Sequence, residues 1–342
     1  MGSARPIAAV VGSTSLLGRE LRDLLSKTPF RTKPIGADEI ETGMPAEDPG
    51  EPAVLTALDE ENLAAARVVF LAGSAEASRT ALEIVSKLDP GPAVVDLTGV
   101  LEERPTAHLR APVVEPAGYI LPRDTEHVVA HPAAILLALF LVRLSQAGAI
   151  CRAVAQIFEP ASERGLRGID ELQKQSIGLL SFQKLPKHVF DEQIAFNLLA
   201  RYGSEAAVSM ESVELRIERH LATLLALNGG IRMPSIRLIQ APVFHGHGVS
   251  LWVEFENNPG VQALEEILAS AHIDVRGPGV EPPTVVGMAG QSGIAVGAIA
   301  SDRNNPHAAW FWVAADNIRI MAEEAVAVAQ SLAGLAGMET DR

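Results

Sequence analysis

The stretch PIAAVVGSTSLLGREL, at residues 6–21, indicates the fold class of the N-terminal half. An apolar run stops at Gly12, and leucines at helical spacing follow over residues 16–26. This order predicts a buried strand, a glycine turn and an amphipathic helix. Gly12 and Gly18 lie where a dinucleotide-binding turn needs glycine, because the backbone there approaches a pyrophosphate and packs against the sheet. Ser15 occupies the middle glycine position of that turn.

The same order of elements recurs farther along the chain. The apolar run Arg67–Leu71 precedes AGSAEAS and a second amphipathic segment, and Ala93–Asp96 follows as a third buried run. Strands and helices that alternate at this length predict a parallel, doubly wound sheet, which is an α/β Rossmann-type domain.

An acidic stretch about twenty residues beyond the glycine turn bears on the choice of dinucleotide. It is ADEIE, which contains Asp38 and Glu39. A carboxylate here accepts hydrogen bonds from a ribose 2′-hydroxyl and repels a 2′-phosphate, so Asp38 facing the pocket favours NAD over NADP. A solvated loop carboxylate explains the same residues, and both interpretations stay open.

The pattern changes from residue 131 onward. A long apolar helix is expected over residues 132–147, and the segments after it alternate as half-buried strands do, for example Val249–Glu256. We expect an α+β second domain with a mainly antiparallel sheet. The final helix is expected to return to the first domain. The predicted domains are residues 1–130 plus 313–338 and residues 131–312.

Composition limits the partners and the compartment. The 342 residues are 48% hydrophobic and 20% charged, which suits two globular domains, and the formal charge of −14 argues against nucleic acid or an anionic membrane as partner. The single cysteine, Cys151, excludes an internal disulfide and a cysteine metal cage. The longest apolar run covers about half of a membrane span. We expect a cytoplasmic protein that binds small molecules or proteins.

Eight stretches, taken in order, resemble the aspartate-semialdehyde dehydrogenase family over nearly the whole chain. They are GSTSLLGREL, FLAGSAEAS, VVDLTG, VVEPAG, DEQIAFNLLA, QAPVFHGHGVSLWVEFE, SGIAVGAIASD and FWVAADNIRIMAEEAVAVA. The resemblance implies a Rossmann domain, a second domain that forms a homodimer, and a C-terminal helix that rejoins the first domain. In that family a cysteine attacks the aldehyde, a histidine takes the proton, nicotinamide accepts hydride, and phosphate releases the acyl group.

The stretch VVAHPAAILLALFL, at residues 128–141, departs from the family pattern. The resemblance places the family's Asn-Pro-Asn-Cys turn on residues 131–134, so Ala134 stands at the nucleophile position. A methyl group cannot form a thiohemiacetal or a thioester. Cys151 begins a strand beyond the helix, where a lone cysteine is usually a small core hydrophobe. The chain therefore looks closest to the cysteine-lacking Usg-like paralogues of the family.

Four more family positions carry altered residues. The resemblance places the phosphate-binding arginine on Glu102, the substrate-carboxylate arginine on Gln240, a lysine on Glu214 and a glutamine on Glu159. Such a pocket is expected to repel an aspartyl substrate and phosphate, because cations that pair with these anions are replaced by an amide and acids.

Other positions match those that lie around the dinucleotide in the family: Gly12, Thr14, Gly18, Ala72, Gly73, Ser74 and Asn317. Thr14 and Ser15 can donate hydroxyl hydrogen bonds to a phosphate, so binding of NAD or NADP is possible, with NAD slightly favoured. That these residues only maintain the Rossmann fold remains the alternative.

His247, in FHGHGVS, stands at the family's retained base position. It is either a general base or a structural imidazole beneath the cofactor. His131 and His245 could join it in a metal site, but no carboxylate spacing supports this, and we expect no metal.

Three functions follow for testing. The first is a non-catalytic homodimer that binds NAD(P) or acts as a scaffold through an unknown protein partner. The second is an oxidoreductase with altered, non-covalent chemistry that uses His247. The third is a nominal semialdehyde dehydrogenase of amino-acid biosynthesis, against which Ala134 argues.

Overall fold

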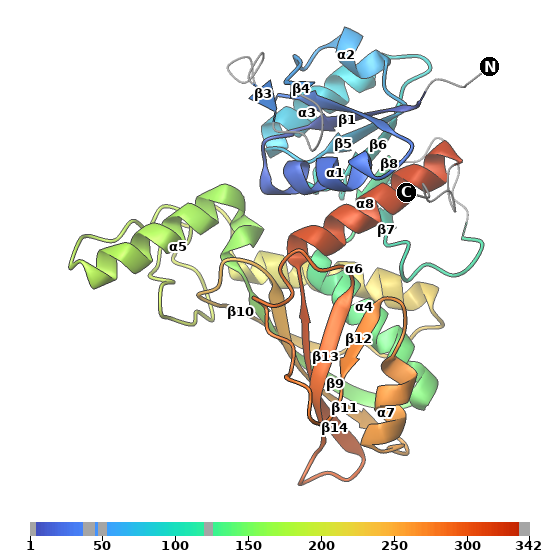
Figure 1. Cartoon of the computed structure of the whole chain (residues 1–342), viewed down its shortest axis with the longest axis vertical. Coiled ribbons are helices and arrows are strands. Elements are labelled where there is room, and N and C mark those ends of the chain that lie inside the picture. The colour runs from blue at the N-terminus through green and yellow to red at the C-terminus, as the bar shows by residue number, and fades with distance from the viewer. Residues whose placement is uncertain (1–4, 37–44, 47–52, 120–125, 335–342) are drawn as a thin grey trace. The chain divides into compact units, whose positions relative to one another are not determined.

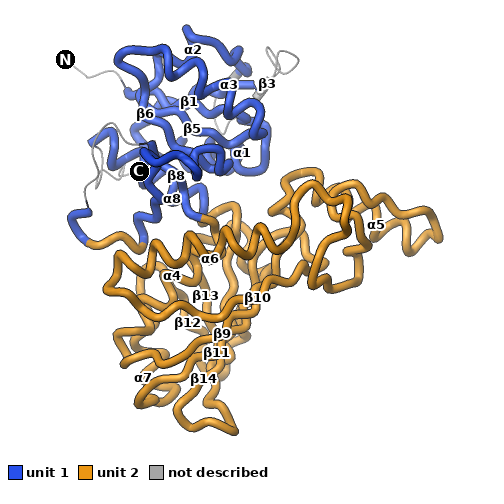
Figure 2. The backbone as a smooth tube through the Cα atoms, turned by 180° about the vertical axis from the view of Figure 1, so that it is seen from behind, with its two compact units in different colours: residues 1–113, 117–130, 321–342 blue, residues 114–116, 131–320 orange. Residues whose placement is uncertain are grey.

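The structure is a computed structural model that describes residues 5–36, 45–46, 53–119 and 126–334. The chain divides into two compact units (Figure 2). Unit 1 comprises residues 1–113, 117–130 and 321–342, and unit 2 comprises residues 114–116 and 131–320.

Unit 1 is built on a six-stranded sheet in the order β2-β1-β5-β6-β8-β7 (Figure 1). Every strand pairs with its neighbours in parallel, which confirms the predicted doubly wound domain. The strands of this sheet are β1 (Ile7–Val11), β2 (Arg31–Ile35), β5 (Val68–Leu71), β6 (Ala93–Asp96), β7 (Ala107–Arg110) and β8 (Glu126–Val129). The other elements are α1 (Leu16–Ser26), α2 (Glu60–Ala64), α3 (Ala75–Val85) and a small antiparallel pair, β3 (Pro45–Ala46) and β4 (Ala53–Val54).

The turns that follow β1 and β5 meet at the point where the strand order reverses. A Cβ atom on Gly12, whose φ is +78°, would lie 2.1 Å from the Cα atom of Gly73, and one on Gly18 would lie 2.3 Å from the carbonyl oxygen of Gly12. Glycine is therefore required at residue 12 by the packing of the two turns, and at residue 18 by the close approach of α1 to the first turn. Open α/β sheets bind ligands at this kind of crevice.

Unit 2 contains a second six-stranded sheet in the order β10-β9-β11-β14-β13-β12. The three inner pairings are antiparallel and the two outer pairings are parallel, so the sheet is mainly antiparallel, as predicted. Its strands are β9 (Ile150–Glu159), β10 (Ser235–Gln240), β11 (His247–Phe255), β12 (Ile273–Arg276), β13 (Ile294–Ser301) and β14 (Ala308–Ala315). Its helices are α4 (Pro132–Leu144), η1 (Ser145–Ala147), η2 (Ala161–Arg164), α5 (Gly165–Leu180), α6 (Met210–Leu227) and α7 (Val261–Leu268). Helix α8 (Asn317–Ala333) begins in unit 2 and belongs to unit 1 from residue 321 onward.

One face of this second sheet carries all three tryptophans of the chain. Trp252 of β11 lies opposite Trp310 of β14, and Trp312 is two residues farther along β14. Side chains opposite each other in a ladder, or two apart on a strand, share a face. Trp310 and Val154 of β9 are exposed, and Asp302 accepts hydrogen bonds from the indoles of Trp252 and Trp310, at 2.7 and 3.2 Å. We call this surface the tryptophan face.

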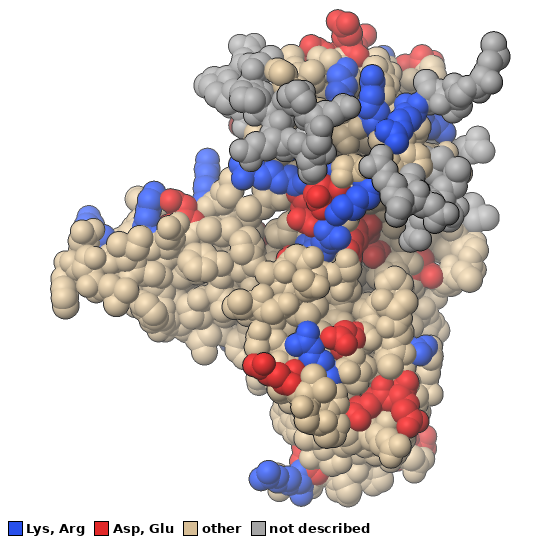
Figure 3. Space-filling model, viewed as in Figure 1, with Lys and Arg blue, Asp and Glu red and all other residues tan. Residues whose placement is uncertain are grey.

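Helix α5 and the segment after it project from unit 2 (Figure 1). Several large apolar side chains of this projection, residues 165–200, are solvent-exposed, and Phe182 is 99% exposed. Most of the surface that it shows in Figure 3 is uncharged, with Lys and Arg side chains along one edge. We call this segment the α5 arm.

Two boundaries differ from the sequence expectation. The apolar helix ends at Leu144, and a short 3-10 turn, η1, takes the last three residues of the expected segment. Residues 313–320 group with unit 2, because β14 runs to Ala315 within the second sheet. In the part of the chain that the structure describes, no helix is both long and apolar enough to cross a membrane.

Candidate functional site

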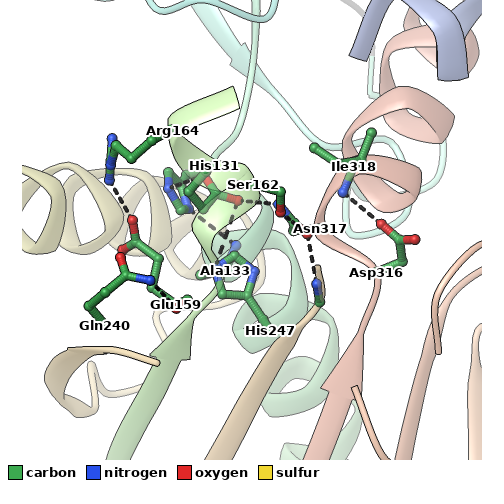
Figure 4. Close-up of polar contacts among 12 residues, drawn as sticks. His131, Ala133, Glu159, Ser162, Arg164, Gln240, His247, Asp316, Asn317 and Ile318 are labelled. Carbon is green, nitrogen blue, oxygen red and sulfur yellow. Dashed lines mark hydrogen bonds and ion pairs between the residues drawn. The ribbon is translucent and has the colours of Figure 1, made fainter. Parts of the chain in front are cut away.

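A cluster of ionisable and polar side chains lies inside unit 2, where α4, β11, η2 and α8 begin and β9 ends (Figure 4). We call it the buried cluster. Its members are His131, Glu159, Ser162, Glu163, Arg164, Tyr202, Gln240, His247 and Asn317.

His131 forms the N-cap of α4, and Pro132 takes the first helical position, where proline is favoured. The ring Nδ1 of His131 accepts a hydrogen bond from the amide of Ala133 at 3.2 Å, so in the neutral ring Nε2 carries the proton. The amide of His131 itself donates to Nδ1 of His220 at 2.9 Å. Ala134, with no exposed surface, follows in the first turn of the helix and presents only a methyl group.

Glu163, on the 3-10 turn η2, joins three elements. Its Oε1 accepts a hydrogen bond from Asn317 Nδ2 at 2.7 Å and lies 3.9 Å from His247 Nε2. Its Oε2 lies 3.5 Å from His131 Nε2. One carboxylate thus stands between the two buried imidazoles, whose ring centres are 6.0 Å apart.

Asn317, the first residue of α8, fixes this arrangement. Its Oδ1 accepts from the hydroxyl of Ser162 at 3.1 Å and from the amide of Gly246 at 3.0 Å (Figure 4). The resemblance assigned Asn317 to the surroundings of the dinucleotide. In this structure its side-chain amide is bonded to Ser162, Gly246 and Glu163, all within unit 2, and a place beside the dinucleotide stays a prediction.

Glu159 ends β9 and forms a buried ion pair with Arg164, whose Nη2 donates to Glu159 Oε1. The guanidinium also lies over the ring of Tyr202, 5.7 Å from its centroid. Tyr202 donates its hydroxyl proton to Gln240 Oε1 at 2.7 Å, and Gln240 Nε2 donates to the carbonyl oxygen of Glu159 at 2.9 Å. The acid at residue 159 therefore has a cation beside it, which the sequence analysis did not anticipate.

Burial controls the protonation of the cluster. It lowers the pKa of His247 to about 4 and that of His131 well below the usual range, so both rings are neutral at neutral pH. Burial also raises the pKa of Glu159 and of Glu163, and the charge of Arg164 opposes that rise in both carboxyls. Burial therefore shifts the pKa values of the carboxyl and imidazole groups toward each other.

Other residues singled out from the sequence lie outside the cluster. In unit 1 the hydroxyl of Ser15 caps α1 by accepting from the amide of Gly18 at 2.9 Å, and it donates to the carbonyl oxygen of Ala72 at 2.7 Å. In this structure its proton is used on Ala72, and donation by Ser15 to a phosphate stays a prediction. Ser74 likewise caps α3.

The altered positions also separate. Glu102 lies in unit 1, after β6, whereas Glu159 and Gln240 meet in unit 2. Glu214 accepts from the amide of Leu238 at 2.7 Å, which links α6 to β10. Asp38 lies outside the described residues.

Three residues of the cluster were not expected from the sequence: Glu163, Arg164 and Tyr202. A signal was present in the run Ser-Glu-Arg at residues 162–164, directly after a buried strand that ends in an acid. Among the described residues, no group of three or more His, Cys, Asp and Glu side chains is arranged to hold a metal ion.

Comparison with known proteins identifies the family of both units. Residues 7–120 match the family model of the semialdehyde dehydrogenase NAD binding domain, and residues 141–320 match that of the semialdehyde dehydrogenase dimerisation domain. A USG-1 protein homolog from Pseudomonas aeruginosa is 29% identical over 328 residues, covering 91% of this chain and 92% of the relative. An aspartate-semialdehyde dehydrogenase from Rickettsia bellii is 26% identical over 325 residues, with the same coverage of 91% and 92%.

Solved structures agree with this assignment. A probable aspartate-semialdehyde dehydrogenase from Pseudomonas aeruginosa superposes with a TM-score of 0.84 at 27% identity, covering 97% of this chain and 99% of that one. Aspartate semialdehyde dehydrogenase II from Vibrio cholerae, complexed with ASA, shares the fold with a TM-score of 0.83 at 21% identity, covering 98% and 100%. The chain belongs to the semialdehyde dehydrogenase family.

Proposed function

We propose that this family member binds a nicotinamide dinucleotide and assembles as a homodimer, but does not oxidise an aldehyde through a covalent acyl-enzyme. The observation that carries the proposal is Ala134. It lies fully buried in the first turn of α4, beside His131 and in the same unit as His247. Covalent aldehyde oxidation needs a nucleophile within reach of its base, and a methyl group offers none.

The altered residues around this position support the same conclusion. Arg164 is paired with Glu159, and Gln240 is bonded to Tyr202 and to backbone carbonyls. Nη2 of Arg164 and the side-chain amide of Gln240 are therefore engaged within the protein. A substrate carboxylate would have to compete with Glu159 for Arg164.

The turn after β1 fits a nicotinamide dinucleotide. Gly12 and Gly18 keep Cβ atoms away from the backbone, and the N-terminus of α1 follows directly, where helix amides and the helix dipole favour a phosphate. Backbone amides at the start of α1, together with the hydroxyls of Thr14 and Ser15, would hold the pyrophosphate. A bound NAD(P) would supply a hydride acceptor. If the carboxylate of Asp38 faces the pocket, NAD is favoured over NADP, because a carboxylate there would repel a 2′-phosphate.

The homodimer would form through the α5 arm and the tryptophan face. Both lie within the residues that match the dimerisation domain, and both expose large apolar side chains, including Phe182 and Trp310. A second copy of the chain would remove these surfaces from water, which is the main driving force for association.

Two assays on the purified protein test the proposal together. Calorimetric titration should show binding of NAD or NADP. Incubation with aspartate semialdehyde, NADP and phosphate should give no reduced dinucleotide above a protein-free control. Phosphate-dependent turnover would overturn the proposal, and so would the failure of both dinucleotides to bind at millimolar concentration.

A second candidate is an oxidoreductase in which His247 moves a proton without a covalent intermediate. The observation that favours it is Nε2 of His247, which is buried and has no hydrogen-bond partner. A neutral imidazole can accept the hydroxyl proton of an alcohol as its carbon loses hydride. A screen of alcohols with NAD, read at the absorbance of the reduced dinucleotide, should then find turnover that His247→Asn abolishes. No turnover with any alcohol would exclude this function for the compounds tested.

A further inference from the structure

Three buried polar atoms of the cluster have no hydrogen-bond partner. They are Oε2 of Glu159, Nε of Arg164 and Nε2 of His247. Native proteins satisfy the large majority of such atoms with protein, water or ligand, because an unpaired buried donor or acceptor is costly. Three such atoms in a single cluster indicate a binding position for a polar group that would form the missing hydrogen bonds.

The position of that group follows from His247 and Glu163. His247 Nε2 lies 3.9 Å from Glu163 Oε1, which is too long for a direct hydrogen bond and short enough for one oxygen atom to bridge. Both side chains are held in place. Glu163 is held by Asn317, and His247, only 1% exposed, begins β11 opposite Ala315.

The charges of the cluster select an uncharged ligand. The buried acids Glu159 and Glu163 have the cations Arg164 and Arg216 beside them, and both imidazoles are neutral. Asp316, which also acts on His247, has its carboxylate bonded to backbone amides of α8 and of Gly290. With both acids ionised, their two negative charges balance the two positive charges of the arginines, so an added anion or ammonium would leave a net charge buried in the cluster.

A hydroxyl group meets these requirements with a single atom, since it can donate one hydrogen bond and accept another. A carboxylate cannot donate, and an ammonium cannot accept. We propose that the buried cluster binds a small neutral hydroxy compound, with one hydroxyl oxygen between Nε2 of His247 and Oε1 of Glu163. The inference rests on the proposed function, in which no aldehyde is held covalently at residue 134.

The test is a titration of the full-length protein followed by the imidazole ¹⁵N signal of His247, assigned from its loss in His247→Asn. The probes are glycerol, glycerate and 2-amino-1,3-propanediol, which have closely similar three-carbon skeletons and are neutral, anionic and cationic. Glycerol should shift the signal saturably below about 0.1 M, and both charged probes should bind at least about tenfold more weakly. Tighter binding of either charged probe, or no shift with glycerol, would overturn the inference.

Variants locate the site. Glu163→Leu should weaken glycerol binding about tenfold, and Glu163→Gln should stay within about threefold, because its amide keeps a polar atom at that place. Glu266→Gln, on the exposed surface of α7, is the matched control and should change nothing. Equal binding by Glu163→Leu and the wild type would refute the placement. If Glu163→Leu does not fold, the relative affinities of the wild type for the three probes test the inference.

The titration contains neither dinucleotide nor aldehyde. Its failure would therefore leave the assay of acyl transfer unaffected, and turnover in that assay would refute the proposed function without changing the ranking of the probes. The two outcomes are separable.

Discussion

Replacing Arg164 with methionine should strongly destabilise unit 2. The change leaves the carboxylate of Glu159, which is 0% exposed, without its cation, with only the long contact of the Tyr202 hydroxyl (3.4 Å) at Oε1 and no partner at Oε2. Removing one member of a buried ion pair costs about 3–5 kcal/mol, because the remaining charge is buried and uncompensated. We therefore expect the free energy of unfolding to fall by about 3 kcal/mol or more at pH 8.

The loss should depend on pH in a defined direction. Burial raises the pKa of Glu159, and loss of the Arg164 charge raises it further. A carboxyl whose pKa is higher in the folded than in the unfolded state binds more protons when folded, so stability falls as pH rises above the unfolded value, 4.5. The destabilisation should therefore be smaller at pH 5 than at pH 8.

Urea unfolding followed by tryptophan fluorescence measures this effect, because all three tryptophans lie in unit 2. The double variant Glu159→Met, Arg164→Met should recover most of the loss, since it removes both charges. Arg152→Met is the control, because Arg152 forms an ion pair with Glu254 at the protein surface. It should lower the free energy of unfolding far less than Arg164→Met does. Wild-type stability of Arg164→Met at pH 8, or a double variant as unstable as the sum of the singles, would refute the reasoning.

Three further predictions concern other parts of the chain. Ser15→Ala should lower the free energy of unfolding of unit 1 by about 1 kcal/mol in thermal unfolding, because it removes the N-cap of α1, whereas Ser26→Ala at the exposed end of that helix should cost less. The pKa of His247 in the folded protein, about 4, is below its unfolded value of 6.5, so the stability that the neutral ring contributes is present above pH 6.5 and is lost as pH falls to 4. The loss is about 3 kcal/mol at most, and urea titrations at pH 7 and 4.5 should show a smaller loss for His247→Asn than for the wild type. Phe182→Ser should weaken the dimer at least about tenfold in sedimentation experiments and leave the unfolding of the monomer unchanged, while Val54→Ser in unit 1 leaves the dimer intact.

Local pattern was enough to predict the elements whose side chains repeat regularly. The leucines of residues 16–26 predict α1 with the bounds that the structure shows, and the apolar run 93–96 predicts β6 in the same way. Strands β2 and β7 have no such pattern, with the sequences RTKPI and AHLR. They are strands because parallel neighbours pair with them, which is a property of the assembled sheet.

The site shows the same division. His131 and His247 could be singled out from their motifs, whereas Glu163 and Arg164 read as an ordinary charged turn. Their role depends on η2 bending back, so that Arg164 reaches Glu159 and Glu163 reaches the histidines. Glu159, expected from the sequence to repel an anionic substrate, is neutralised by Arg164, five residues farther along the chain. Only the folded structure shows that these two residues pair.

The most direct test of the central claim is a rapid-mixing experiment with aspartate semialdehyde and NADP in the absence of phosphate. An enzyme that forms an acyl intermediate releases about one equivalent of reduced dinucleotide per subunit in a fast burst, even when it cannot complete the cycle. With Ala134 at the nucleophile position we predict no burst. A burst of one equivalent, abolished by Cys151→Ser, would show that another residue supplies the nucleophile and would contradict the account.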